Sequence, residues 1–210
     1  MTTKKKKHAT AQLNAITARG TENDIWNVPN IITMVRLVLA IAVFVLIPLH
    51  QFTAALIVFV IAASTDWMDG YWARKYGQVT KLGRVLDPFV DKIIICGTYI
   101  FLAAEVNSGI AAWMATVVMG RELLVTALRS VIEGSGGDFS AKWAGKVKMV
   151  VQCLAVVASL VALRHFAQYG AGTPLPDWLG VVLPIAVWGS IAITIYSGLE
   201  YVFIAAKKMN

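Results

Sequence analysis

The feature that most constrains this chain is a series of six apolar stretches separated by short polar turns. Crossing a hydrocarbon core of about 30 Å takes about 20 helical residues, and each stretch is roughly that long. Backbone groups in lipid must satisfy their own hydrogen bonds, which favours helices over open sheets. We therefore expect an all-α integral membrane protein with six transmembrane helices, at residues 30–49, 53–76, 82–104, 109–132, 142–164 and 178–205.

The composition agrees with a membrane protein. Hydrophobic residues make up 58% of the chain and charged residues only 15%, whereas a soluble domain has about 25% charged residues. The formal net charge of +7 would also suit a nucleic-acid-binding protein. However, the basic residues lie at the ends of the apolar stretches and not along one soluble face, so we expect no nucleic-acid partner.

The chain divides into a basic polar tail or interfacial segment (1–29), a membrane domain (30–205) and a short C-terminal tail (206–210). The first tail contains Lys4 to Lys7, which either form a solvated segment or bind anionic lipid. Most of the 19 Lys and Arg residues fall on one side of the predicted membrane. Because cytoplasmic loops carry the excess of Lys and Arg, we expect both termini in the cytoplasm.

Four aspartates interrupt the second and third stretches. The turn between them centres near Val79, and a helix rises about 1.5 Å per residue, so Asp69 and Asp87 lie about 15 and 12 Å from that turn. By the same count Asp66 and Asp91 lie about 20 and 18 Å from it. Their i,i+3 and i,i+4 spacings put each pair on one helix face. We expect the four carboxylates to converge in the cytoplasmic half of the membrane.

Four carboxylates at matched depths repel one another unless a cation is present. Oxygen donors favour Mg²⁺ or Mn²⁺ over zinc, and the site has room for two ions. Arg74, one turn beyond Gly70, can reach a phosphate that the same ions hold. In one alternative, the aspartates only pair with Lys92, Arg74 and Arg84; in another, they belong to a cation transporter. A transporter often has internal repeats and a site at the midplane, and the sequence shows neither.

The aspartates belong to a longer pattern: Asp-x-x-Asp-Gly-x-x-Ala-Arg, eight residues, and then Gly-x-x-x-Asp-x-x-x-Asp. The chain contains this pattern without a gap, as Asp66, Asp69, Gly70, Ala73, Arg74, Gly83, Asp87 and Asp91. In these residues it resembles the CDP-alcohol phosphatidyltransferase family. The six-stretch organisation is similar to that of the family over nearly the whole chain.

The resemblance implies that the four aspartates bind two metal ions and that Asp91 is the general base for the acceptor alcohol. It also implies which residues bind the cytidine diphosphate group of a CDP-lipid: Pro29, Asn30, Ile31, Ile32, Thr33, Gly70, Ala73, Arg74 and Thr80. Asn30 and Thr33 share a helix face, where they could hydrogen-bond a polar base. Asn30 could instead, or in addition, cap the first helix.

A second group of charges lies in the fourth stretch and at the start of the fifth, and comprises Arg121, Arg129, Lys142, Lys146 and Lys148. A buried arginine and several lysines beside an acidic metal site indicate a second anion, such as a phosphorylated alcohol. The alternative is that these residues anchor the helices at the cytoplasmic boundary, with Arg121 and Glu122 forming a structural pair.

Three local motifs resemble the branch of the family that uses sn-glycerol 3-phosphate and makes phosphatidylglycerol phosphate. They are Asp-Pro-x-x-Asp-Lys from Asp87 to Lys92, Gly-Arg-Glu around Arg121, and Gly-Lys-x-Lys ending at Lys148. Met149 stands where this branch is expected to have threonine. Acceptors such as inositol phosphate or inositol are therefore the alternative.

The resemblance implies that CDP-diacylglycerol, glycerol 3-phosphate and membrane lipid are the partners. It further implies a homodimer in the bacterial inner membrane with its active site facing the cytoplasm.

The segment from Asp66 to Asp91 contains no Ser, Cys or His that could serve as a covalent nucleophile. We therefore expect a direct displacement in a single step.

Overall fold

The computed structural model describes residues 28–76, 81–134 and 143–209, and every regular element within them is an α-helix. The helices are α2 (Val28–Leu46), α3 (Phe52–Tyr76), α4 (Lys81–Ala104), α5 (Ala112–Gly134), α6 (Trp143–Tyr169) and α7 (Asp177–Met209). The predicted all-α fold class is therefore confirmed. Nearly all of the predicted N-terminal tail lies outside the described residues.

The predicted and observed boundaries differ by three or more residues at four helix ends, and α7 continues to Met209 beyond the predicted residue 205. α2 ends at Leu46 and not at residue 49, because Pro48 disfavours helical backbone in the residue before it. α5 begins at Ala112, after a turn that includes residue 109. α6 continues beyond residue 164 to Tyr169 and stops at Gly170, whose φ of 96° is in the left-handed region that glycine adopts at helix ends.

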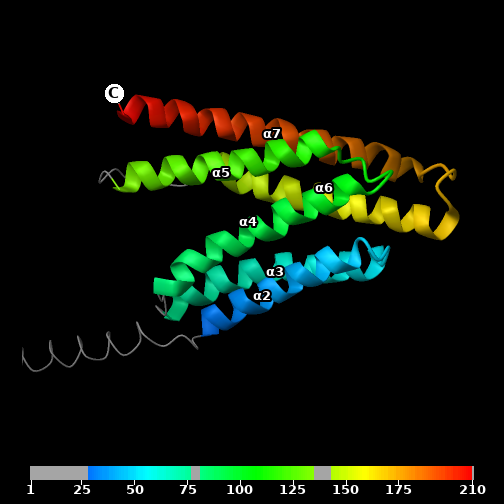
Figure 1. Cartoon of the computed structure of the whole chain (residues 1–210), viewed down its shortest axis with the longest axis horizontal. Coiled ribbons are helices and arrows are strands. Elements are labelled where there is room, and N and C mark those ends of the chain that lie inside the picture. Colours follow the sequence, from blue (N-terminus) through cyan, green and yellow to red (C-terminus); the bar gives the residue numbers. More distant parts are fainter. Residues whose placement is uncertain (1–27, 77–80, 135–142, 210) are drawn as a thin grey trace, which may run out of the picture.

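The helices run alternately up and down the bundle (Figure 1). We call the end at which α2, α4 and α6 begin, and α3, α5 and α7 end, the motif end. The loops 47–51, 105–111 and 170–176 lie at the opposite end. This order brings the last turns of α3 and the first turns of α4 to the same end of the bundle, which the depth count for the aspartates requires.

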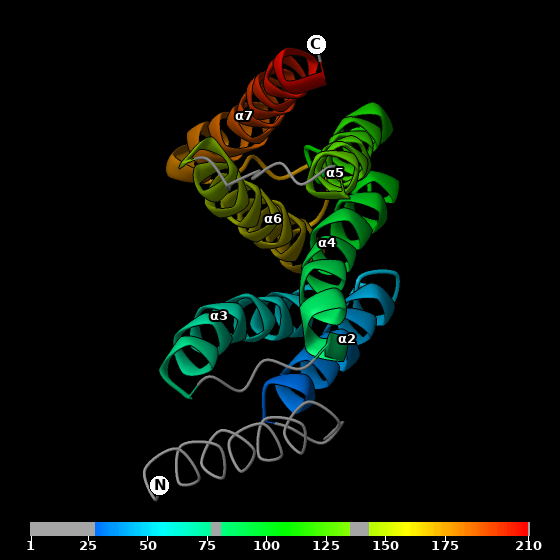
Figure 2. The same ribbon diagram turned by 90° about the vertical axis from the view of Figure 1, so that its left-hand side faces the viewer.

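α4 connects two groups of helices. α2 packs against α3 and α4, while α5 packs against α4 and α7, and α6 contacts α3, α4 and α7. α4 crosses obliquely between the α2–α3 pair and the α5–α7 group (Figures 1 and 2). Gly97 allows a close contact with α2, because a Cβ at that position would lie 2.3 Å from the Phe44 ring.

The surface of the bundle carries many large apolar side chains. On α2, Ala40 and Val43 are fully buried, but Val38 and Ile41 are 65% and 53% exposed. Large exposed apolar side chains also occur on α3, α5, α6 and α7. A soluble monomer rarely exposes so much contiguous apolar surface, and contact with lipid explains it.

Two helices in the described part of the chain are long and apolar enough to cross a membrane, over Val147–Tyr169 and Asp177–Lys207. Two further apolar segments are shorter, Ile31–Leu46 and Phe52–Thr65. The second of these stops directly before Asp66, where the charged motif begins. The helical bundle agrees with the predicted membrane protein, while the count of six spans and the cytoplasmic position of the termini stay predictions.

Candidate active site

The aspartate motif occupies the end of α3 and the first half of α4, at the motif end of the bundle (Figure 1). Asp66 and Asp69 are in α3, and Asp87 and Asp91 are in α4. The side chains of Asp66, Asp69 and Asp87 lie outside what the structure describes, so the convergence of the four carboxylates stays a prediction.

The residues predicted to bind the CDP-lipid are described only in part. Five of them lie in helices, but the structure describes only their backbone: Pro29, Asn30, Gly70, Ala73 and Arg74. Thr80 lies outside the described residues entirely. Of the others, Ile31 is exposed, Ile32 is half-buried and Thr33 is buried. Thr33 therefore places a hydroxyl on the inward face of α2, near the motif end.

Asp91 forms an ion pair with Arg36, one turn beyond Thr33 on α2. The distance from Arg36 Nη1 to Asp91 Oδ1 is 2.5 Å, and the Arg36 side chain is 2% exposed. The sequence alone gives no role to Arg36, and the partners it offers for the aspartates are Lys92, Arg74 and Arg84. The spacing of Thr33 and Arg36 at i,i+3 was the available signal, because it puts both on one face of α2.

Among the described contacts, Lys92, the next residue of α4, forms a hydrogen bond with α5 and not with α2. Its Nζ donates a hydrogen bond to Thr126 Oγ1 on α5 at 2.5 Å, and Thr126 donates to the Glu122 carbonyl oxygen at 2.6 Å. Consecutive residues of a helix point about 100° apart. Asp91 and Lys92 therefore connect α4 to α2 and to α5, respectively.

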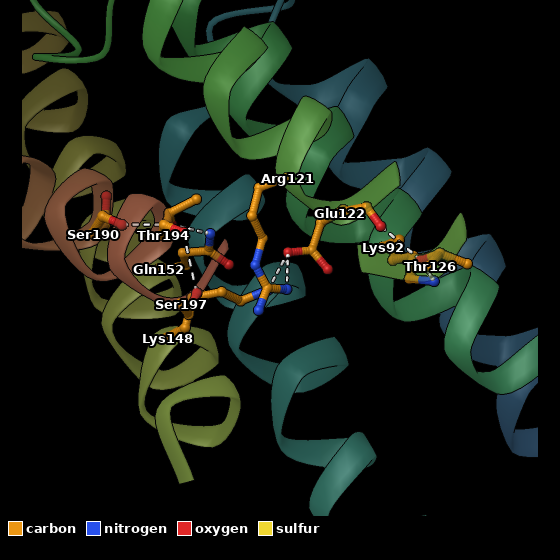
Figure 3. A network of polar contacts seen from close by, with 9 residues as sticks. All are labelled: Lys92, Arg121, Glu122, Thr126, Lys148, Gln152, Ser190, Thr194 and Ser197. Atoms are coloured by element: carbon orange, nitrogen blue, oxygen red, sulfur yellow. Dashed lines mark hydrogen bonds and ion pairs between the residues drawn. The ribbon is translucent and has the colours of Figure 1, made fainter. Parts of the chain in front are cut away.

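The buried ionic cluster of the second half consists of Arg121 and Glu122 on α5 and Lys148 on α6 (Figure 3). Glu122 Oε1 accepts a hydrogen bond from Arg121 Nη1 at 2.9 Å and another from Lys148 Nζ. The Arg121–Glu122 ion pair, which is expected if these charges only anchor the helices, is thus present. However, two cations share one carboxylate, so these three side chains carry a net positive charge, which is costly in a buried place without an anion.

The other predicted acceptor residues add little to this description. Arg129 is half-buried on α5, and its Nε has no hydrogen-bond partner within the described residues. The side chain of Lys146 and all of Lys142 lie outside the described residues. A phosphate-binding role for these three residues stays a prediction.

α7 supplies a wall beside Arg121 that the sequence analysis missed. The Arg121 guanidinium lies 5.4 Å from the centre of the Tyr201 ring, within the range of a cation–π interaction. A Cβ on Gly198 would lie 3.1 Å from Arg121 Cγ, so the glycine makes room for the arginine stem. The signal in the sequence was a glycine and an aromatic residue at i,i+3 near the end of an apolar helix.

A buried polar network fixes α7 to its neighbours (Figure 3). Gln152, one turn beyond Lys148 on α6, donates from Nε2 to Thr194 Oγ1 at 2.9 Å. Tyr99 on α4 donates from its hydroxyl to Ser190 Oγ at 2.8 Å. All four of these side chains are fully buried, and their hydrogen bonds hold α7 in register against α4 and α6.

The donor chemistry of the motif suits a hard divalent cation, because carboxylate oxygens dominate it. Among the described side chains, no three His, Cys, Asp or Glu residues lie close enough together to hold a metal. Three of the four motif aspartates are outside that set, so the metal site stays a prediction.

Comparison with known proteins identifies the family. The model of the CDP-alcohol phosphatidyltransferase family matches residues 26–196. A Bacillus subtilis protein named CDP-diacylglycerol–glycerol-3-phosphate 3-phosphatidyltransferase is 36% identical over 194 residues, which cover 84% of this chain and 94% of that protein.

Two other relatives carry the same name. The Escherichia coli K12 protein is 31% identical over 150 residues, covering 69% of this chain and 82% of the relative. The Shigella flexneri serotype 5b protein is 29% identical over 190 residues, covering 88% and 97%, respectively. The family match spans α2 to most of α7 and includes the whole aspartate motif. The chain is therefore an enzyme of the CDP-alcohol phosphatidyltransferase family.

Proposed function

We propose that this enzyme transfers the phosphatidyl group of CDP-diacylglycerol to sn-glycerol 3-phosphate and so forms phosphatidylglycerol phosphate and CMP. The names of the Bacillus, Escherichia and Shigella relatives support both substrates. Within the structure, the observation that carries the choice of acceptor is the buried Arg121–Glu122–Lys148 cluster, whose charge is positive overall. A phosphorylated alcohol supplies the anion that such a cluster favours.

The proposed reaction is a direct displacement at phosphorus. A free hydroxyl oxygen of glycerol 3-phosphate attacks the phosphorus that carries the diacylglycerol, and its proton passes to the Asp91 carboxylate. The bond from that phosphorus to the bridging oxygen of CMP breaks, and CMP leaves with the electron pair. Two divalent ions, bound by Asp66, Asp69, Asp87 and Asp91, would neutralise the charge that develops on the diphosphate.

The residues of the chain then have distinct tasks. The CDP group would lie along the end of α3 and the start of α2, where Arg74 provides a cation for its phosphates and Thr33 a hydroxyl. Arg121 and Lys148 would bind the phosphate of the acceptor, and Glu122 would hold their cationic groups in place before it arrives. The acyl chains of the donor would stay in lipid beside the apolar surface of the bundle.

We also propose that the enzyme is a homodimer in the bacterial inner membrane, with the motif end toward the cytoplasm. The excess of Lys and Arg at the sequence positions that border this end supports the orientation. Val106, which is 81% exposed in the loop at the opposite end, and the exposed Lys207 are suitable sites for labelling. Single cysteines introduced at 106 and 207, in a chain whose Cys96 and Cys153 are replaced, are labelled with a membrane-impermeant reagent to test the orientation, because only residue 106 should react from outside the cell.

The acceptor is tested by CMP release from CDP-diacylglycerol by the purified enzyme in detergent with Mg²⁺. Glycerol 3-phosphate should support turnover, whereas glycerol, which lacks the phosphate, should be at least about 100-fold less effective because it cannot pair with Arg121 and Lys148. Inositol phosphate, inositol and serine complete the series. Faster release with inositol phosphate would replace the proposed acceptor, and no release with any alcohol under Mg²⁺ or Mn²⁺ would contradict the reaction itself.

A further inference from the structure

Arg36 is a buried charged side chain to which the proposed reaction gives no task. It lies in α2, well inside the bundle, and is 2% exposed. Removing a guanidinium from water is costly unless it gains a carboxylate in good geometry. Among the described contacts, Arg36 bonds to the carboxylate of Asp91, on a different helix and 55 positions away in the chain. An ordinary structural pair would not need to involve the proposed base.

We propose that Arg36 is a positioning residue for Asp91, and this inference rests on the role of Asp91 in the proposed function. A guanidinium is planar and donates in fixed directions, so a bond to Oδ1 limits rotation of the carboxylate. The orientation of the whole carboxylate toward the acceptor hydroxyl is then restricted, as a general base requires. Arg36 acts through Asp91 and does not itself touch the reacting atoms.

The backbone of α4 supports this assignment. Lys92 bonds to Thr126 on α5, on the other side of α4 from α2. Asp91 is thus held through its side chain by α2 and through its helix by α5. Restraint from two directions is what a base requires, because a displacement of about 1 Å from productive geometry can cost about 100-fold in rate.

The inference makes an unusual prediction about metal affinity. Arg36 places a positive charge beside a carboxylate that is proposed to bind cations, so it opposes metal binding while it orients the ligand. A neutral residue at position 36 should therefore bind Mn²⁺ more tightly and yet turn over more slowly. If Arg36 only stabilised the fold, its replacement should disorder Asp91 and weaken both metal binding and turnover.

The experiment compares Arg36→Gln and Arg36→Lys with the wild type and with Arg164→Gln as a matched control. Arg164 is an exposed arginine at the opposite end of the bundle. Mn²⁺ binding to the substrate-free enzyme is measured by electron paramagnetic resonance, and kcat and KM are measured separately for both substrates. Thermal unfolding without metal identifies a variant that does not fold.

For Arg36→Gln we expect kcat to fall about 30-fold, KM values within about threefold of wild type, and a Kd for Mn²⁺ that is about three- to tenfold lower. Arg36→Lys keeps the charge but loses the planar donor geometry, so its Kd for Mn²⁺ should return to the wild-type value while kcat stays at least about fivefold low. Arg164→Gln should match the wild type in both measurements.

A wild-type kcat in Arg36→Gln, or weaker Mn²⁺ binding in that variant, overturns the inference. If Arg36→Gln does not fold, Arg36→Lys decides, and wild-type turnover in that variant also overturns it. The Asp91→Asn variant shows whether the role of Arg36 or the proposed reaction itself is wrong. Full turnover in Asp91→Asn removes Asp91 as the base, whereas an inactive Asp91→Asn beside a fully active Arg36→Gln removes only the role of Arg36.

Discussion

Arg36 and Arg121 both carry a charge inside the bundle, but their surroundings differ in a way that matches two kinds of ligand. Arg36 meets a carboxylate from another helix, next to a motif that contains three more aspartates. Arg121 shares the single carboxylate of Glu122 with Lys148. The first region is rich in negative charge and suits cations, while the second has an excess cation and suits a phosphate. Substitutions in the two regions should therefore affect different kinetic quantities.

The largest effect is expected from Asp91→Asn, in the acidic region. The amide keeps the shape of the side chain but cannot accept the proton of the acceptor hydroxyl, so kcat should fall about 1,000-fold or more. Binding of CDP-diacylglycerol, measured by calorimetry in detergent, should stay within about threefold of wild type. A drop in donor affinity that parallels the loss of turnover would argue that Asp91 serves only to build the donor site.

Arg121→Gln is the corresponding change in the cationic region. Loss of a charge-assisted hydrogen bond should raise KM for glycerol 3-phosphate about 30- to 100-fold, because such bonds contribute about 2–3 kcal/mol. KM for CDP-diacylglycerol should change less than about threefold. Initial rates over a matrix of both substrates provide the measurement. Equal increases in the two KM values would contradict the assignment of the acidic region to the donor and of the cationic region to the acceptor.

A smaller change in the same region comes from Gly198→Ala on α7. The new Cβ would lie 3.1 Å from Arg121 Cγ, so the arginine stem must shift by a few tenths of an ångström. We expect KM for glycerol 3-phosphate to rise about threefold with little change in kcat. Gly189→Ala is the control on the same helix, since its Cβ would find ordinary contact at 3.8 Å from Val151. If both variants have the same KM, α7 does not position Arg121.

The smallest effect is expected from Thr194→Val, which removes the acceptor of the Gln152 amide. The buried amide loses a hydrogen bond, so the free energy of unfolding should fall by about 1 kcal/mol. Thermal unfolding in detergent measures this, with Thr116→Val as the control, because Thr116 is exposed and bonds only within its own helix in the described contacts. A larger loss in the control would show that hydroxyl removal on its own is destabilising.

The fold was largely predictable because lipid restricts the chain to helices and the turns have clear signals. Apolar periods, Pro48 and the glycine turns placed the six helices of the described residues to within about five residues at each end. The end of α6 was set too early, at Arg164, where polar residues such as His165 and Gln168 begin to interrupt the apolar run. That helix continues through them and ends at a left-handed glycine, which hydropathy does not reveal.

Spacing within one helix predicts candidate site residues, whereas contacts between helices do not follow from it. The family pattern predicts Asp91 as a site residue, and the charges predict Arg121 and Lys148, and these roles stay predictions. The partner of Asp91 is on α2, and the wall beside Arg121 is on α7. Neither contact follows from local sequence, because each depends on how the helices pack. Arg36 and Tyr201 therefore emerged only from the structure.

The order of the helices along the chain also determines which part of the candidate site can form first during synthesis. The helices proposed to carry the donor and the metal ions are α2, α3 and α4, which end at Ala104, whereas the acceptor residues begin on α5. A ribosome delivers the chain from its N-terminus, and early segments associate before later ones are made. Since α2 contacts both α3 and α4, the Arg36–Asp91 pair can form in the membrane while α6 and α7 are still untranslated. The proposed site for the lipid donor can thus form before the proposed site for the water-soluble acceptor exists.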